Sequence, residues 1–225
     1  LYEQMKGHFL KAIELNPSFS KAHYQLALVY NKDGNDDSAE NHLIKSTKLD
    51  LTKIEQNDRL INKYLEKFQF QNAKFLLNEN QNIKVDCSFS YYLLACIYLN
   101  QTKILQAKEN LIKSINFYSG FSKSHRDLGK LFLKENEIDL AKKHLDLSLD
   151  LNYGDYKTQY YFGLAMKEEA DYNQAEIFFS TSLDMNLNFP PCLIEMAILK
   201  LLMNKNKEAK MYYMKAKQFL KEAYH

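Results

Sequence analysis

The chain has 225 residues, of which 46% are hydrophobic and 26% charged, and 30 basic residues against 28 acidic ones leave a formal net charge of +2. This composition is typical of a folded protein with a sizeable core, and its near balance of charge gives no sign of a chain-wide nucleic-acid surface. Only 3 prolines and 6 glycines stand against 16 tyrosines and 14 phenylalanines, which favours helices and argues against disorder. No apolar run approaches the roughly 20 residues that span a bilayer.

The cysteines, at positions 87, 96 and 192, have neither the even number nor the spacing of a disulfide framework. Zinc would need a C-x-x-C motif or a histidine pair at ligand spacing, and the sequence has neither. We therefore expect reduced thiols, no metal and no cofactor. We also expect a cytoplasmic location, provided that no signal or anchor precedes Leu1, which is not a methionine.

Taken in chain order, residues 1–19 form the second half of a repeat that Pro17 closes, and six full repeats follow. Each repeat holds two amphipathic stretches with apolar residues at helical spacing, so the whole chain is predicted to be one helical array. The predicted repeats are 20–53, 54–87, 88–121, 122–155, 156–189 and 190–225. This division predicts thirteen helices and no strand, with irregular ends expected in repeat 54–87.

The repeat is visible as columns of small residues that recur every 34 positions. One column is Ala39, Ala73, Ala107, Ala141, Ala175 and Ala209. A second column, on the first helix of each repeat, is Ala27, Ile61, Ala95, Gly129, Gly163 and Ala197. Small residues on two facing helices allow their backbones to approach closely, so we expect both columns to be structural.

The turns between helices are polar, as in "KDGNDD" at 32–37 and "EEADYN" at 168–173, and they offer Asn and Asp as helix caps. Ser20, Ser88 and Ser122 are expected to cap the first helices of their repeats.

The period, the small columns and an aromatic column resemble the tetratricopeptide repeat (TPR) family over essentially the whole chain. The usual Trp position is held by His23, Asn57, Tyr91, His125, Gln159 and Leu193, and Pro17 is the one closing proline that remains. The resemblance implies an all-α fold, a right-handed superhelical solenoid of stacked antiparallel helix pairs, whose first helices line a concave groove.

Helical geometry places positions 2, 5, 6, 9 and 13 of each first helix opposite the apolar core, and hence on that groove. The candidate peptide-binding residues are Lys21, Tyr24, Arg59, Asn62, Phe89, Tyr92, Lys123, Arg126, Lys130, Lys157, Tyr160 and Tyr161. Tyr and Arg are the side chains most enriched at binding hot spots. We predict that the surface from Phe89 to Tyr161 binds a peptide that carries acidic and apolar residues.

The expected function is a non-catalytic scaffold for protein–protein interaction, with self-association through the repeat ends also open. The alternative is a recruitment arm of a larger enzyme or multidomain protein, because residue 1 falls inside a repeat. The carboxylate clamp known from TPR proteins does not carry over, because Tyr161 and Glu195 occupy the slots that follow Arg126 and Lys130. The asparagine ladder does not carry over either, because Asn62 is alone in its column. Single-stranded nucleic acid is a weaker candidate for the groove. Catalysis has no support, because His23 and His125 fall in a core column and no Ser, Cys or metal partner is expected beside His8, His42 or His144.

Overall fold

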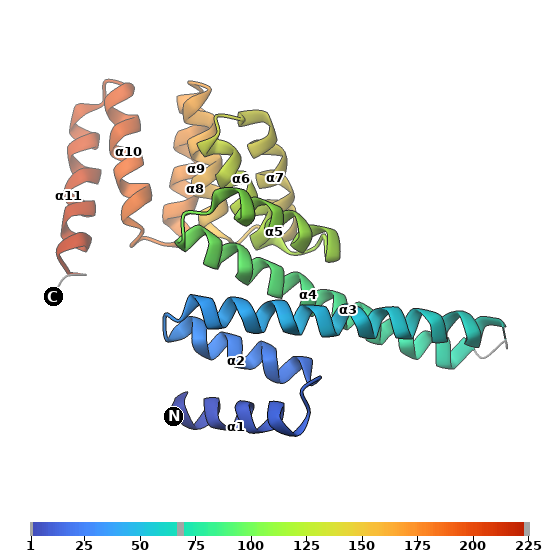
Figure 1. The fold of residues 1–225 in the computed structure, drawn as a ribbon. Helices are drawn as coiled ribbons and strands as arrows, with labels where there is room; N and C mark the ends of the chain where they lie inside the picture. The colour runs from blue at the N-terminus through green and yellow to red at the C-terminus, as the bar shows by residue number, and fades with distance from the viewer. Residues whose placement is uncertain (1, 67–69, 223–225) are drawn as a thin grey trace. The chain divides into compact units, whose positions relative to one another are not determined.

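The computed structural model describes residues 2–66 and 70–222, with side chains for all of these except 2, 58, 59, 61–66, 70, 71, 73, 74, 77, 221 and 222. Within these residues the fold consists of eleven helices and no strand (Figure 1). The helices form two compact units, Leu1–Ser119 and Gly120–His225. The predicted all-α fold is confirmed.

The first unit contains α1 (Tyr2–Leu15), α2 (Ser20–Lys32), α3 (Asp36–Glu66), α4 (Phe70–Asn100) and α5 (Ile104–Phe117). Its helices pack as successive neighbours, α1 with α2, α2 with α3, α3 with α4 and α4 with α5. Apolar side chains of α2, α3 and α4, among them Ala27, Leu43 and Ile97, form one buried cluster between these helices.

The prediction of thirteen helices is wrong, because α3 and α4 each run for 31 residues through a position where a turn was expected. Neither expected turn, near residues 51–54 and 84–88, contains Gly or Pro, so nothing in the sequence interrupts the helical hydrogen bonds there. Ser88 lies inside α4, where its hydroxyl is 3.1 Å from that of Ser114. The irregular ends expected for repeat 54–87 are not found, because Ile54 and Cys87 lie inside α3 and α4; residues 67–69 lie outside the described residues.

The predicted serine caps are also wrong. Phe19 and Phe121 hold the N-cap positions of α2 and α6, and neither helix start has a side-chain cap hydrogen bond. The expected aspartate caps do occur in the second unit, where Asp171 accepts a hydrogen bond from the backbone N–H of Gln174 at 3.1 Å.

The second unit contains α6 (Ser122–Lys134), α7 (Ile138–Leu151), α8 (Tyr156–Glu168), α9 (Tyr172–Met185), α10 (Pro190–Leu202) and α11 (Asn206–Glu222). These are three antiparallel hairpins, α6 with α7, α8 with α9 and α10 with α11 (Figure 1). Each new hairpin packs its first helix against the preceding one, α8 on α7 and α10 on α9.

The 34-residue period persists in the backbone of the turns. Residues at corresponding positions have positive φ, namely Gly34, Thr102, Asn136, Ala170 and Asn204, with φ between 58° and 73°. A single left-handed residue ends one helix and redirects the chain into the next, and glycine or asparagine adopts it at little cost.

Where their side chains are described, the small columns are structural, as predicted; Ile61 and Ala73 lie outside the described side chains. Ala39, Ala107, Ala141 and Ala175 are completely inaccessible to solvent. A Cβ atom added to Gly129 would lie 2.8 Å from Cγ of Leu145, so the neighbouring side chain leaves no room there.

Two histidine pairs recur at the same place in the repeat. Nδ1 of His23 lies 2.9 Å from Nδ1 of His42, and Nδ1 of His125 lies 3.1 Å from Nδ1 of His144. One nitrogen of each short contact must donate and the other accept, so each pair is stable only while a ring is neutral. His42 and His144 each pair with a histidine of the core column on the preceding helix.

These pairs predict a loss of stability in mild acid. Burial first, and then the charge of the partner histidine, lowers the pKa of His144 to about 4, and burial lowers the pKa of His23 and His42. The unfolded chain, with histidine pKa values near 6.5, then binds more protons than the folded chain below that pH, so stability falls as the pH falls. Between pH 7.5 and 5, denaturant titrations should show a loss on the order of 1–2 kcal/mol.

The control for this prediction is the exposed His8 on α1. His8→Gln should leave the pH profile unchanged, whereas replacing both His42 and His144 by Phe should flatten it. An equally steep profile in the double variant would contradict the assignment to the histidine pairs.

Candidate peptide-binding groove

In the second unit, the first helices of the hairpins, α6, α8 and α10, lie side by side and line a groove of about 750 Å³. Tyr160 and Tyr161 of α8 form its aromatic floor, with ring centroids 5.2 Å apart. Phe189, which precedes α10, packs edge-on against Tyr160 at 5.2 Å. Aromatic rings held in this way offer a large apolar surface at low conformational cost.

Four lysines and two glutamates line the same groove, so its wall carries net positive charge. Lys167 donates to Glu195 at 2.6 Å, which neutralises both side chains. Lys130 lies 5.7 Å from the centroid of the Tyr161 ring, a cation–π contact that keeps its ammonium group at the groove. Among the described residues, no carboxylate forms an ion pair with Lys130, Lys134 or Lys157.

Both groove tyrosines remain protonated at neutral pH. Burial, followed by the charge of Asp127, raises the pKa of Tyr161 to about 12, and burial with the charge of Glu195 raises the pKa of Tyr160. Their phenol groups can therefore donate hydrogen bonds to a carboxylate or carbonyl oxygen of a ligand.

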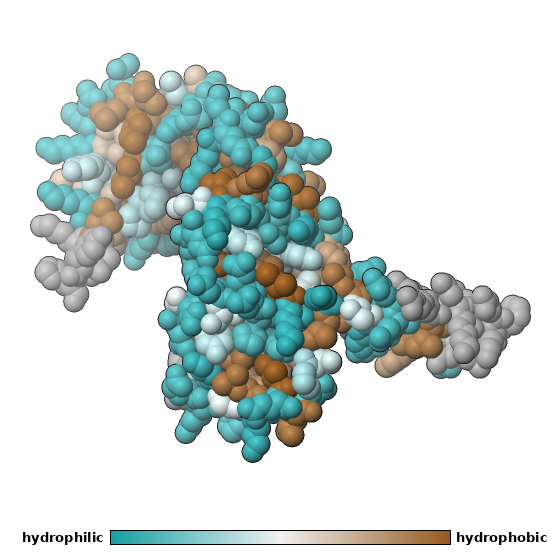
Figure 2. All heavy atoms as spheres, viewed as in Figure 1, coloured by the Kyte–Doolittle hydropathy of each residue, from teal (hydrophilic) through white to brown (hydrophobic). Residues whose placement is uncertain are grey.

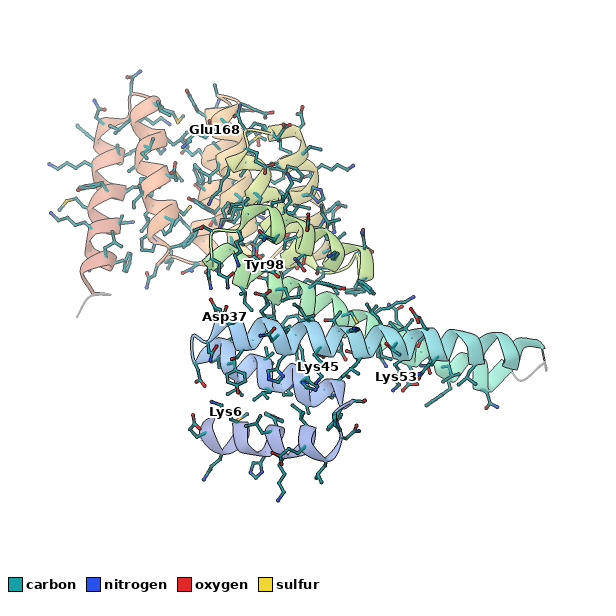
Figure 3. The ribbon with its side chains drawn as sticks, in the orientation of Figure 1. Lys6, Asp37, Lys45, Lys53, Tyr98 and Glu168 are labelled. Carbon is teal, nitrogen blue, oxygen red and sulfur yellow. The ribbon has the colours of Figure 1, made fainter. Side chains whose placement is uncertain are left out.

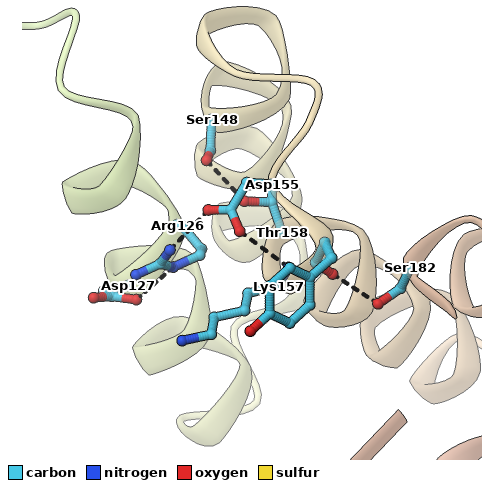
Figure 4. Close-up of polar contacts among 8 residues, drawn as sticks. Arg126, Asp127, Ser148, Asp155, Lys157, Thr158 and Ser182 are labelled. Carbon is cyan, nitrogen blue, oxygen red and sulfur yellow. Dashed lines mark hydrogen bonds and ion pairs between the residues drawn. The ribbon is translucent and has the colours of Figure 1, made fainter. Parts of the chain in front are cut away.

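Arg126 does not lie free at the groove (Figure 4). The residue is 8% exposed, and its Nε donates to Asp127 at 2.8 Å while its Nη1 donates to Asp155 at 2.7 Å. Burial alone would lower its pKa, but the hydrogen bonds and charges of both aspartates outweigh that effect and raise it. Asp155 also caps α8 by accepting from the backbone N–H of Lys157 at 3.0 Å, so Arg126 ties α6 to the start of α8.

The first unit has an aromatic row of its own. The ring centroid of Phe89 lies 6.2 Å from that of Tyr24 and 6.3 Å from that of Tyr92. Lys21 and Tyr24 line a cavity of about 530 Å³ that also contains three carboxylates, Asp50, Glu79 and Asp86. Lys53, labelled on α3 in Figure 3, donates a hydrogen bond to one of these carboxylates, that of Glu79, at 2.7 Å. This cavity is less suited to an acidic ligand than the groove of the second unit.

The predicted set of site residues is thus divided. Lys130, Lys157, Tyr160 and Tyr161 line one groove, whereas Lys123 is exposed on α6 and does not line it. The other predicted residues of the first unit, Arg59 and Asn62, have side chains outside the described part of the structure.

Some groove residues lie outside the positions that helical geometry assigned to the groove. Among them are Lys167 and Phe189. Phe189 could have been recognised, because Phe121 occupies the corresponding position before its own repeat. No helix in the described residues is long and apolar enough to cross a membrane, and no cluster of three or more His, Cys, Asp or Glu side chains there could hold a metal ion.

Stacked antiparallel helix pairs with a groove along their first helices define a class of helical-repeat proteins. Residues 8–41 and 90–119 each match a family model described as tetratricopeptide repeat. These two segments are tetratricopeptide repeats.

Solved structures show the same fold. The chain is similar to YrrB, described as a TPR protein with an unusual peptide-binding site, with 16% identity and a TM-score of 0.63 over 94% of this chain and 91% of that one. It is also similar to PilW, a type IV pilus biogenesis factor, with 17% identity and a TM-score of 0.65 over 90% of this chain and 78% of that one. MamA matches with 17% identity and a TM-score of 0.54 over 73% of this chain and 97% of that one. Comparison with curated protein sequences finds no match.

Proposed function

We propose that this protein is a non-catalytic interaction scaffold whose second unit binds a partner peptide in the groove of α6, α8 and α10. The observation that carries the proposal is the aromatic floor of Tyr160 and Tyr161 beside Lys130, Lys134 and Lys157, which no carboxylate neutralises among the described residues. The expected ligand is an extended or helical peptide with acidic and apolar residues. The peptide-binding site named for YrrB, a protein of the same fold, lends support.

The chemistry of the groove explains this preference. Apolar side chains of a peptide would cover the tyrosine rings, and its carboxylates would replace solvent around the lysine ammonium groups. Long-range attraction by exposed lysines is screened over about 8 Å at physiological ionic strength, so association should slow as salt is raised. The absence of a disulfide among the three cysteines, at positions 87, 96 and 192, is consistent with a proposed reducing, cytoplasmic location.

The test is a selection from a random peptide library followed by titration of the selected peptides. We expect enrichment of Asp or Glu together with aromatic or aliphatic residues. Tyr160→Ala and Lys157→Glu should each weaken binding at least about fivefold, which corresponds to about 1 kcal/mol. Fluorescence anisotropy with labelled peptides would measure the change.

Lys123→Glu is the matched control, because Lys123 is exposed on α6 but does not line the groove. It changes the net charge as much as Lys157→Glu does, so it separates a local contact from a general charge effect. Equal affinity of the wild type and both groove variants for every selected peptide would contradict the proposal.

A further inference from the structure

The last hairpin of the second unit, α10 with α11, exposes a column of residues that every other described hairpin buries. Tyr213 of α11 is 57% exposed. The residues at the corresponding position of the earlier repeats are 0–1% exposed: Leu43, Leu111, Leu145 and Phe179. The column is apolar throughout, and among these five described members Tyr213 alone faces solvent.

The preceding hairpin shows what kind of element covers this column. Phe179 of α9 lies under α10, whose Cys192 thiol donates to the Phe179 carbonyl at 3.5 Å. An amphipathic helix is therefore the element that this surface accommodates in the protein itself.

The exposed side of α10 is more apolar than the corresponding side of α8. Leu201 is 55% exposed and stands where α8 has Lys167, which reaches across to Glu195 of the next helix. Ile198 and Leu202 are exposed by 39% and 48%. Apolar side chains gather along α10 and α11 on the face drawn in Figure 2. An exposed apolar patch of this kind favours an apolar contact with a partner, in place of an ion pair like that of Lys167 with Glu195.

The charge around this patch is positive. Lys210, Tyr213, Lys217 and Leu220 follow one another at helical spacings of three and four along a single stripe of α11. No carboxylate lies within ion-pairing distance of Lys210 or Lys217 among the described residues. The nearby acid of α11, Glu208, is already paired with the buried Lys200 at 2.6 Å.

We propose that the end surface of α10 and α11, formed by Ile198, Leu201, Lys210, Tyr213, Lys217 and Leu220, docks an acidic amphipathic helix of another protein. The apolar stripe of that helix covers Tyr213 and Leu201, and its carboxylates meet Lys210 and Lys217. A second copy of this chain applied through the same surface would bring these lysines together, so charge disfavours it. The proposal is independent of the groove, because none of these six residues lines it.

The test uses a synthetic helix of about 18 residues, with leucines at helical spacing flanked by glutamates, and a scrambled peptide of the same composition. The full chain should bind the ordered peptide and not the scrambled one in fluorescence anisotropy. Tyr213→Ala should weaken binding at least about fivefold, and Lys210→Glu with Lys217→Glu at least about tenfold. Circular dichroism should show unchanged helix content, because all three side chains are exposed.

Matched controls are Tyr153→Ala, which removes another tyrosine that is 67% exposed, and Lys143→Glu on α7. Neither should change the affinity. Loss of binding in Tyr160→Ala with full binding in Tyr213→Ala would overturn the proposal by placing the helix in the groove. Tyr213-dependent dimerisation, or binding to anionic lipid vesicles in place of the peptide, would also overturn it.

Discussion

Replacing Arg126 by alanine is expected to lower the free energy of unfolding by about 3–5 kcal/mol, the cost of removing one partner from a buried ion pair. The substitution leaves Asp127 and Asp155, whose side chains are 13% and 10% exposed, without the cation that holds them. It also frees the carboxylate that caps α8, so the contact between two successive hairpins is weakened. Denaturant titration followed by circular dichroism would measure the loss.

Lys142→Ala is the appropriate comparison. Lys142 forms an ion pair with Glu169 at 3.0 Å, and the two side chains are 32% and 35% exposed. An ion pair in contact with solvent contributes about 0–1 kcal/mol, so this variant should be close to the wild type. If the two variants had the same unfolding midpoint, the structural role assigned to Arg126 would be wrong.

This role changes how the groove should be tested. A peptide that binds less tightly to an Arg126 variant could do so because α6 and α8 have separated, without any direct contact to the arginine. Lys157 and Tyr160 are better probes, because both line the groove and Lys157 is exposed while Tyr160 is half-buried.

The grouping of the groove residues could be predicted because it depends on one period. Tyr160 and Tyr161 are adjacent in sequence, and Lys130 lies on the corresponding helix of the preceding repeat, so helical geometry alone brings them to one face. The burial of Arg126 could not be predicted in this way. One of its partners, Asp155, is 29 residues away at the start of another helix, and only the packing of two hairpins brings them together.

Other features of the structure that were not predicted could have been recognised in the sequence. The histidines of each pair are 19 residues apart in both units, so the recurrence itself pointed to a shared contact. The long helices α3 and α4 could have been predicted from the lack of Gly and Pro between residues 50 and 90, had the resemblance not suggested turns there. The burial of Lys200 is harder to predict from the sequence. This lysine occupies a column of Tyr, Phe and Met, and it is 3% exposed because Glu176 and Glu208, each 2.6 Å away, pair with it.

Replacing Gly163 by leucine is expected to destabilise the second unit by about 3 kcal/mol or more, at the upper end of overpacking costs. A Cβ atom at Gly163 would lie 2.5 Å from two ring carbons of Phe179, and that ring is completely buried. A displaced ring would press on the surrounding core, which includes Phe162, Cys192 and Met196, because protein interiors have few voids to absorb it. The unfolding midpoint in urea should fall accordingly.

Gly7 provides a control with the opposite expected sign. It also lies within a helix, α1, but a Cβ atom there would meet nothing within 4 Å. Gly7→Leu should therefore stabilise α1 by about 0.5–1 kcal/mol, because leucine has the higher helix propensity and no neighbour obstructs it. If Gly163→Leu raised the midpoint, as Gly7→Leu is expected to do, helix propensity would outweigh packing at Gly163. The close approach of α8 and α9 would then not be the reason for a small residue at that position.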